Sequence, residues 1–268
     1  MSSTCLEFKD LTLGYQRHAA VHHLSGVVER GSLTAVVGAN GSGKSTLMKG
    51  VAGILKPISG SFDAAYRRLA YLPQQSEIDR SFPARVIDLV SLGFWQERGL
   101  VGRMTRSDKA RLLGCLAAVG LSGFETRSLD SLSGGQMQRA LFARTMLQDA
   151  DLILLDEPFN AVDERTVRDL LALIRQWGDE GRTILCVLHD HALVKGHFPQ
   201  TLLMARKRVA WGRTTDVMTP DNLAAARTFQ EAWDENAAWC VEPVPALLPQ
   251  TPEDPLHGRD VARSAAHV

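Results

Sequence analysis

Apolar positions in the first 75 residues follow the periods of β-strands. Leu6–Leu11 alternates between apolar and polar residues, as a half-buried strand does. Leu33–Val37 is a continuous β-rich run, which is typical of a strand buried on both faces. Further short strands are predicted at 23–29, 59–62 and 67–72.

The pattern changes to helical spacing between about residues 83 and 148. Apolar residues recur there every three or four positions, and Thr105 is placed to cap the helix that follows it. Buried strands at 152–155 and 183–188 come next, and the segment 202–211 is expected to form a hairpin that turns near 206–208. Helices are also predicted at 44–52, 137–148 and 167–177. Strands that alternate with helices predict a parallel α/β sheet covered on both faces, with 83–148 as an inserted helical subdomain.

The last 27 residues, 242–268, hold five of the 11 prolines and show no periodicity. This composition is typical of a disordered, linker-like segment. We therefore expect one domain over residues 1–241, followed by a disordered tail that carries His257 and His267.

Composition narrows the function classes. The 268 residues are 45% hydrophobic and 22% charged, and the 30 basic side chains balance the 30 acidic ones, which argues against a general nucleic-acid binder. The cysteines are far apart, so we expect neither a disulfide framework nor a zinc motif: Cys5, Cys115, Cys186 and Cys240. No apolar run approaches the ~20 residues of a membrane span, and the N-terminus does not have the pattern of a signal peptide. A membrane role would therefore have to act through a partner.

A glycine-rich loop follows the strand that ends at Val37. Residues 38–45 read Gly-Ala-Asn-Gly-Ser-Gly-Lys-Ser and fit the pattern G-x-x-x-x-G-K-[ST]. Glycines let several backbone N–H groups face one anion, and the helix that starts near Lys44 points the positive end of its dipole there. We expect Lys44 to reach the β- and γ-phosphates of a nucleotide, and the Ser45 hydroxyl to ligate Mg²⁺. The nucleotide-binding residues expected in this loop are Gly38, Asn40, Gly41, Ser42, Gly43, Lys44, Ser45 and Thr46.

Two acids, Asp156 and Glu157, end the apolar strand 152–155. Ligands in open α/β sheets bind at the carboxyl ends of strands, so we expect Asp156 to hold Mg²⁺, mostly through water. We expect Glu157, one residue on, to polarise the attacking water. Phosphoryl transfer depends on such positioning and charge neutralisation more than on covalent chemistry.

The segment 132–136, Leu-Ser-Gly-Gly-Gln, precedes the predicted helix 137–148 and is here called the signature segment. A helix start with a hydroxyl and two glycines is a second phosphate-binding surface, formed by Ser133, Gly134, Gly135 and Gln136. One ATP cannot use both surfaces of one chain if they sit on separate subdomains. We therefore expect a head-to-tail homodimer with ATP sandwiched between the two chains.

These motifs resemble, in their order, those of ATP-binding cassette (ABC) ATPases. The resemblance covers about residues 4–230 and is carried by residues 38–46, Gln74, the signature segment, 152–158, Asp163 and His189. It implies a P-loop NTPase core of RecA-like α/β fold, with an antiparallel β subdomain and an inserted α-helical subdomain. It also implies an active ATPase that uses Mg²⁺.

The resemblance assigns roles to four further side chains. Tyr15 is similar to the aromatic residue that stacks on adenine, and Gln74 to the glutamine that senses Mg²⁺ and γ-phosphate. Asp163 matches the residue that communicates across the dimer, and His189 matches the γ-phosphate switch. Gln75 is adjacent, but the position directly after the proline favours Gln74. The implied catalytic residues are Lys44, Gln74, Glu157 and His189, and the implied Mg²⁺ ligands are Ser45, Gln74 and Asp156.

Three kinds of cassette compete: importer subunits, exporter subunits, and soluble ATPases that act on ribosomes or DNA. A single cassette disfavours the translation type, and the 59 positions from Gln74 to Ser133 leave no room for the long coiled coil of DNA-repair types. Residues 125–131 lack the Thr-x-Val-Gly-x-x-Gly-like element of exporters. The importer class is therefore favoured.

The segment after Gln74 contains Asp79-Arg-Ser-Phe82-Pro83-Ala-Arg-Val86. This pattern is similar to cassettes of zinc, manganese and iron importers, most of all to bacterial zinc-uptake subunits. This resemblance implies a peripheral protein at the cytoplasmic face of the cell membrane. Its partners would be a permease and, indirectly, a metal-binding solute-binding protein, with no nucleic acid. Phe82-Pro83 is expected to line the groove for a permease helix. Because the cassette does not touch the cargo, iron-chelate import (siderophore or haem) stays the alternative, ahead of an exporter or a soluble ATPase.

Two groups of basic side chains are not assigned to a site. The histidines His18, His22 and His23 are expected to be solvated loop residues and not a metal site. Residues 206–208, Arg-Lys-Arg, are expected to form a solvated hairpin turn and not a lipid contact, although related cassettes often have glycine where Lys207 stands.

Overall fold

The computed structural model describes residues 3–15, 18–80, 82–99, 103–160 and 162–231. The predicted tail at 242–268, the proposed domain boundary at 241 and Cys240 lie outside the described residues.

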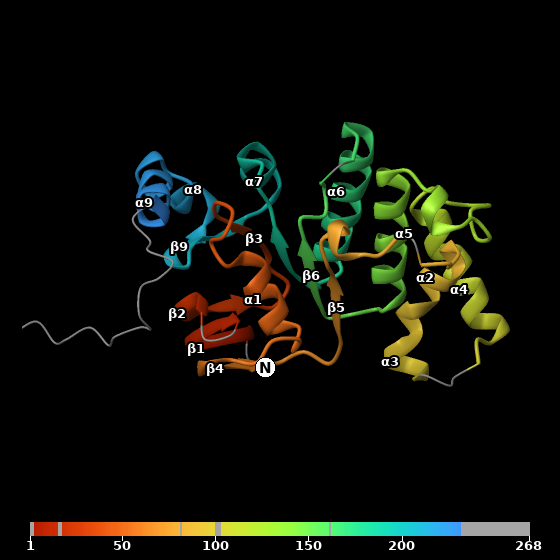
Figure 1. Cartoon of the computed structure of the whole chain (residues 1–268), viewed down its shortest axis with the longest axis horizontal. Helices are drawn as coiled ribbons and strands as arrows, with labels where there is room; N and C mark the ends of the chain where they lie inside the picture. Colours follow the sequence, from red (N-terminus) through yellow and green to blue (C-terminus); the bar gives the residue numbers. More distant parts are fainter. Residues whose placement is uncertain (1–2, 16–17, 81, 100–102, 161, 232–268) are drawn as a thin grey trace, which may run out of the picture. The chain divides into compact units, whose positions relative to one another are not determined.

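A six-stranded sheet lies at the centre of the fold, with its strands in the order β5-β6-β7-β3-β8-β9 (Figure 1). All neighbouring strands are parallel except β9, which pairs antiparallel with β8. The strands are β3 (Leu33–Val37), β5 (Leu69–Leu72), β6 (Leu152–Asp156), β7 (Thr183–Val187), β8 (Gln200–Ala205) and β9 (Lys207–Arg213). The parallel pairing brings the carboxyl ends of β3, β6 and β7 to one edge, where parallel sheets bind ligands.

A second, three-stranded antiparallel sheet has the order β2-β1-β4. Its strands are β1 (Thr4–Tyr15), β2 (His18–Glu29) and β4 (Ser59–Ala64). Together with helix α1 (Lys44–Val51), it packs on one face of the central sheet. The antiparallel β subdomain and the α/β core predicted from the sequence are therefore confirmed.

Alternation along β6 divides the hydrophobic core into two layers. Leu152 and Leu154 face α1 and the antiparallel sheet, whereas Ile153 and Leu155 face the helices on the other side. On that side lie α5 (Gly134–Leu147) and α6 (Glu164–Asp179), where Phe142 and Trp177 stack with ring centroids 5.8 Å apart. Burial on both faces explains why these strands are apolar without interruption.

The segment between β5 and β6 is mainly helical, as predicted. It contains α2 (Val86–Ser91), α3 (Trp95–Arg98), α4 (Arg106–Ala118) and α5, with 3₁₀ turns η1 (Gln75–Glu77), η2 (Leu92–Phe94) and η3 (Leu129–Ser131). Thr105 caps α4 as expected: its hydroxyl accepts from the Asp108 amide at 3.1 Å, and the Asp108 carboxylate accepts from the Thr105 amide at 2.9 Å. None of the helices that the structure describes is long and apolar enough to cross a membrane.

The sequence-based account of the histidines as loop residues is wrong. β2 begins at His18 and not at residue 23, and it pairs with β1 from Tyr15↔His18 to Thr4↔Glu29. His23 has a positive φ of 49°, and register shifts interrupt this pair of strands, which hides the alternation in the sequence. His22 is buried, with its Nε2 3.0 Å from the Ala19 carbonyl oxygen.

One further boundary and two helices differ from prediction, while the hairpin turn lies where it was expected. Helix α5 begins at Gly134 and not at Met137, because Ser133 caps it and its glycines are already helical. The turn of the β8–β9 hairpin is at Arg206, with φ 59°, and Lys207 already belongs to β9, so the absence of glycine at 207 is not a strain. Beyond α7 (His191–His197), the helices α8 (Thr214–Val217) and α9 (Pro220–Glu231) were not predicted at all.

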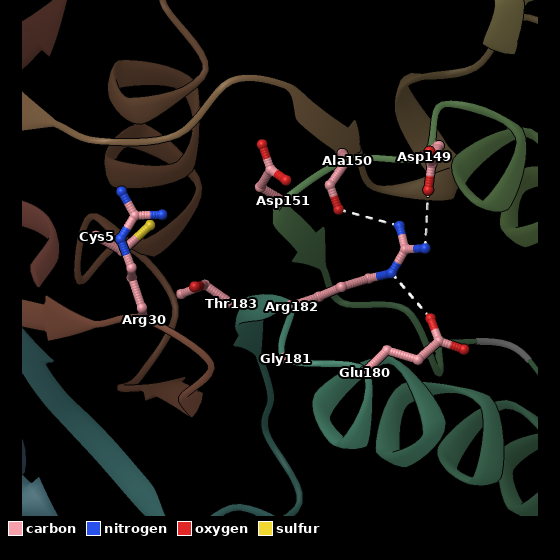
Figure 2. A pocket seen from close by; sticks show the side chains of 9 residues that line it. All are labelled: Cys5, Arg30, Asp149, Ala150, Asp151, Glu180, Gly181, Arg182 and Thr183. Atoms are coloured by element: carbon pink, nitrogen blue, oxygen red, sulfur yellow. Dashed lines mark hydrogen bonds and ion pairs between the residues drawn. The ribbon is translucent and has the colours of Figure 1, made fainter. Parts of the chain in front are cut away.

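At the opposite, amino-terminal edge of the sheet lies a polar pocket of about 250 Å³ (Figure 2). Arg182 fills one side and donates hydrogen bonds to the Ala150 carbonyl at 3.1 Å, Asp149 at 2.9 Å and Glu180 at 3.0 Å. Asp151 accepts from the backbone amides of residues 67 and 68. These charged groups bind other segments of the chain, so the pocket is a structural junction.

We predict that Arg182→Met destabilises the fold by about 1–2 kcal/mol, because the apolar stem stays while three hydrogen bonds are lost. Urea unfolding measures this change. Arg168→Met is the control: Arg168 pairs with Glu164 at an exposed surface, where an ion pair contributes about 0.3–0.5 kcal/mol. Equal unfolding midpoints for the two variants would contradict the junction role.

Candidate active site

The glycine-rich loop joins β3 to α1, as the sequence predicts. Gly43 lies at the helix N-cap with φ 92°, a left-handed conformation that favours glycine. A Cβ atom on Gly43 would lie 2.3 Å from the Ala20 carbonyl oxygen, and one on Gly38 would lie 2.3 Å from the Met204 carbonyl oxygen. Glycine is therefore required at both positions by the neighbouring strands β2 and β8.

Lys44 lies within this loop and is almost entirely buried. Its ammonium donates to the Gly38 and Ala39 carbonyl oxygens, both at 2.8 Å. Burial lowers the pKa of Lys44, and the nearby carboxylates of Glu157 and Asp156 oppose this effect. Because the buried ammonium of Lys44 hydrogen-bonds only to neutral oxygens, its positive charge remains available to bind an anion.

Three side chains from separate elements converge beside the loop. The Ser45 hydroxyl of α1 lies 3.2 Å from Asp156 Oδ1 at the end of β6. Gln74, which follows β5, donates from Nε2 to the Ser45 hydroxyl at 3.1 Å. The structure thus brings together the three residues that the sequence nominates for Mg²⁺.

These residues fit a magnesium ion by their donor chemistry. Asp156 is fully buried and its Oδ2 has no hydrogen-bond partner, and burial raises the pKa of Asp156 to about 6. An unpaired buried carboxylate oxygen is costly unless a cation or water satisfies it. With the Ser45 hydroxyl and the amide oxygen that Gln74 also carries, it would supply an all-oxygen set of the kind that Mg²⁺ prefers.

Glu157 is the residue after Asp156 and has a positive φ of 51°. Such a backbone is strained for a residue other than glycine, and strain of this kind is concentrated at functional sites. His189, two residues beyond the end of β7, donates from Nε2 to Glu157 Oε1 at 2.7 Å, and Asn160 donates to the other carboxylate oxygen. Because β6 and β7 are adjacent and parallel, their two carboxyl ends place Glu157 and His189 together.

Tyr15 lies at the end of β1 with 48% of its surface exposed. The ion pair with Glu77, at 2.7 Å, raises the pKa of Lys49 on α1, and Tyr15 adds a smaller contribution of the same sign. The exposed ring of Tyr15 is therefore accessible enough to stack on a planar ligand.

The signature segment forms the start of α5. The Ser133 hydroxyl accepts from the Gln136 amide at 3.2 Å, and the Gln136 side chain accepts from the Ser133 amide at 3.0 Å, so the two residues form a capping box. Gly135 adjoins Asp163: a Cβ there would lie 3.4 Å from Asp163 Oδ2. Asp163 caps α6 through the Thr166 amide at 2.9 Å, which lowers the pKa of Asp163.

The predicted site residues therefore form two groups. The phosphate-loop cluster consists of residues 38–46 with Gln74, Asp156, Glu157 and His189, and the signature cluster consists of Ser133–Gln136 with Asp163. Figure 1 shows α1 and α5 apart, with β5 and β6 between them. A helix N-terminus favours an anion. Because the two clusters lie apart, the phosphates of one nucleotide cannot contact both clusters of the same protein chain.

Sequence reasoning did not identify several partners of these residues. Asn160 donates a hydrogen bond to Glu157. The sequence indicated this partner only by its position, three residues after Glu157 in the same loop. Arg139 bonds Thr166 at 3.1 Å and Asp169 at 2.8 Å beneath the signature cluster, a pairing across α5 and α6 that no local pattern reveals. Among the residues that the structure describes, no group of three or more His, Cys, Asp or Glu side chains could hold a metal ion by itself.

Comparison with known proteins gives three findings. A family model described as ABC transporter matches residues 21–160. The manganese transport system ATP-binding protein MntB of Listeria monocytogenes is 35% identical over 228 residues, which cover 82% of this chain and 95% of the relative. The zinc transport system ATP-binding protein TroB of Treponema pallidum is also 35% identical, over 82% of this chain and 86% of the relative.

Among solved structures, one of an inward-facing metal-chelate type ABC transporter matches with a TM-score of 0.76. It is 28% identical, and the match covers 84% of this chain and 89% of that chain. The similarity therefore extends over most of both chains.

We predict that Gly43→Ala disrupts the phosphate loop, because its Cβ would clash with the Ala20 carbonyl in a left-handed backbone. Nucleotide affinity, measured by isothermal titration, should fall at least about tenfold, since strain of this kind costs about 1–3 kcal/mol. Gly53→Ala is the matched control: φ is 73° there, but no atom lies within 4 Å of the added Cβ. If Gly43→Ala bound nucleotide as well as Gly53→Ala did, the steric account of the loop would be wrong.

Proposed function

The chain belongs to the ABC transporter family, and we propose that it is the ATP-hydrolysing subunit of an importer for a divalent metal, zinc or manganese. Cassettes of this family bind nucleotide and couple ATP hydrolysis to transport. They form dimers and work with a membrane permease, so their location is peripheral to the membrane. The face proposed here is the cytoplasmic one.

The observation that carries this proposal is the convergence at the carboxyl edge of the sheet. Lys44 would hold the β- and γ-phosphates and neutralise charge on the transferring group. Glu157 would orient the attacking water and accept its proton, and His189, 2.7 Å from Glu157, would donate to the γ-phosphate in the closed state. Ser45, Gln74 and Asp156 would hold Mg²⁺, which supplies charge neutralisation at the phosphate oxygens when bound.

Two chains are needed to complete each site. Because the signature cluster lies on α5, apart from α1, we infer that Ser133 and the Gly134–Gly135 amides close the site of the other chain. A two-fold axis would then generate two identical sites, each with a phosphate-loop cluster from one chain and a signature cluster from its partner. Tyr15 would stack on adenine, and Asp163, beside Gly135, would lie near the centre of such a dimer.

The helical segment offers a surface for the permease. Phe82 is 66% exposed, and Leu92 and Trp95 are about half exposed. Exposed aromatic and aliphatic side chains of this size, close in sequence, are typical of a protein contact. We propose that this surface receives a helix of the permease, as the Phe82-Pro83 segment suggested from the sequence.

The names of the relatives favour a metal cargo, and one observation favours a second candidate. Relatives named for manganese and zinc transport are 35% identical to this chain, whereas the metal-chelate type transporter is 28% identical. Because the similarity to the metal-chelate type is lower, import of a metal chelate is the second candidate. The choice depends on the permease and on a solute-binding protein, because the cassette itself does not contact the cargo.

We predict that Glu157→Gln binds ATP with unchanged affinity but hydrolyses it at least about 100-fold more slowly, because the general base is lost. ATP should then accumulate a stable dimer, which size-exclusion chromatography with light scattering detects. ADP serves as the control ligand and should leave the variant monomeric. A Glu157→Gln chain that hydrolyses ATP at the wild-type rate would show that another residue is the base.

The importer assignment is tested by purification of the tagged chain from its native membranes, with mass spectrometry of the associated proteins. A multi-span membrane protein is the expected partner. Its solute-binding protein is then assayed for zinc, manganese and iron chelates by calorimetry, and tight binding of the free divalent ion is expected. Recovery of ribosomal or DNA-repair proteins without a membrane protein would overturn the importer while leaving the ATPase intact.

A further inference from the structure

The segment after β5 contacts the signature segment within the same chain. Gln75 donates from Nε2 to the Gly134 carbonyl at 2.9 Å, and the Arg80 guanidinium donates to the Leu132 carbonyl. These two carbonyls belong to the residues on either side of Ser133. The segment 75–80 therefore holds the backbone of Ser133 from both sides.

The other end of this segment is attached to the phosphate-loop cluster. Gln74, the immediate neighbour of Gln75, donates to the Ser45 hydroxyl at 3.1 Å. Glu77 adds a second attachment, because its carboxylate accepts from Lys49 of α1 at 2.7 Å. Gln74 thus bonds to the phosphate-loop cluster, and its neighbour Gln75 bonds to the signature cluster.

The connection between the clusters is short and ordered. Residues 75–77 form the 3₁₀ turn η1, and the Glu77 amide donates to the Gln74 carbonyl at 3.0 Å. Hydrogen bonds weaken steeply when distance or angle departs from the ideal. A displacement of Gln74 at the nucleotide would therefore change the hydrogen bond of Gln75 instead of being absorbed by a flexible loop.

We propose that Gln75 is a positioning residue that couples a chain's own phosphate-loop cluster to its own Ser133. This inference rests on the proposed function, in which Ser133 acts on the ATP bound by the partner chain. Nucleotide at one phosphate loop then prepares the signature segment for the other nucleotide of the dimer. Gln74 reports the ligand to Gln75, and Gln75 holds the Gly134 carbonyl.

The side-chain hydrogen bond of Gln75 goes to the signature segment, so the experiment must separate an effect on dimerisation from an effect on nucleotide binding. In the Glu157→Gln background, Gln75→Ala should keep the ATP affinity of the monomer within about twofold. ATP-dependent dimerisation, measured by sedimentation velocity, should weaken about tenfold, since one hydrogen bond is lost at each of two equivalent sites.

Two further variants separate the hydrogen bond from packing. Gln75→Glu keeps the size of the side chain but replaces the donating amide with an acceptor, so it should weaken dimerisation at least as much as Gln75→Ala. Gln96→Ala is the matched control, because Gln96 makes the same kind of bond, from Nε2 to the Leu69 carbonyl at 2.7 Å, away from both clusters. It should leave both measurements unchanged.

The outcomes are distinct. If the Glu157→Gln parent does not dimerise with ATP, the sandwich of the proposed function fails, and this inference fails with it. If the parent dimerises and Gln75→Ala or Gln75→Glu dimerises equally well, the inference alone is overturned. A loss of monomer ATP affinity as large as the loss of dimerisation also overturns it, since Gln75 would then support the phosphate loop and not the signature segment.

Discussion

The parallel pairing of β3, β7 and β6 is the constraint on which the site depends. Because strands buried on both faces are apolar, the polar side chains that can bind ligands lie just beyond the carboxyl ends of these strands. The phosphate loop follows β3, Asp156 ends β6, Glu157 lies one residue on, and His189 follows β7. The register of the sheet therefore sets the 2.7 Å contact between His189 and Glu157 and the 3.2 Å contact between Ser45 and Asp156.

The second constraint is the placement of helix starts. α1 and α5 each present a helix N-terminus with glycines, and each of these surfaces favours an anion. They lie on opposite sides of β5 and β6, so the two proposed half-sites of one chain cannot meet. Dimerisation through ATP would bring a half-site of one chain to the complementary half-site of its partner. The segment 74–80 would fix the position of the two half-sites of one chain relative to each other.

Much of this arrangement could be predicted from the sequence, because the signals are local. The buried strand 33–37, the glycine loop and the capping box at Thr105 each follow from a few neighbouring residues, and each is confirmed. β2 was predicted too short because a positive φ at His23 and register shifts break the alternation. The contacts of Gln75 and Asn160 could not be predicted, since they depend on which segments the folded chain brings side by side.

The central claim, that each active site combines the phosphate loop of one chain with the signature segment of another, is tested most directly by mixing two inactive variants. Lys44→Ala destroys the phosphate loop, and Ser133→Arg blocks the signature segment. A dimer of one Lys44→Ala chain and one Ser133→Arg chain would hold both defects in one site and leave the other site intact. ATP hydrolysis should therefore recover on mixing, up to about a quarter of the wild-type rate, as two-fold symmetry with random pairing dictates. If no mixing ratio recovered hydrolysis, or if either variant alone were fully active, the shared-site account would be contradicted.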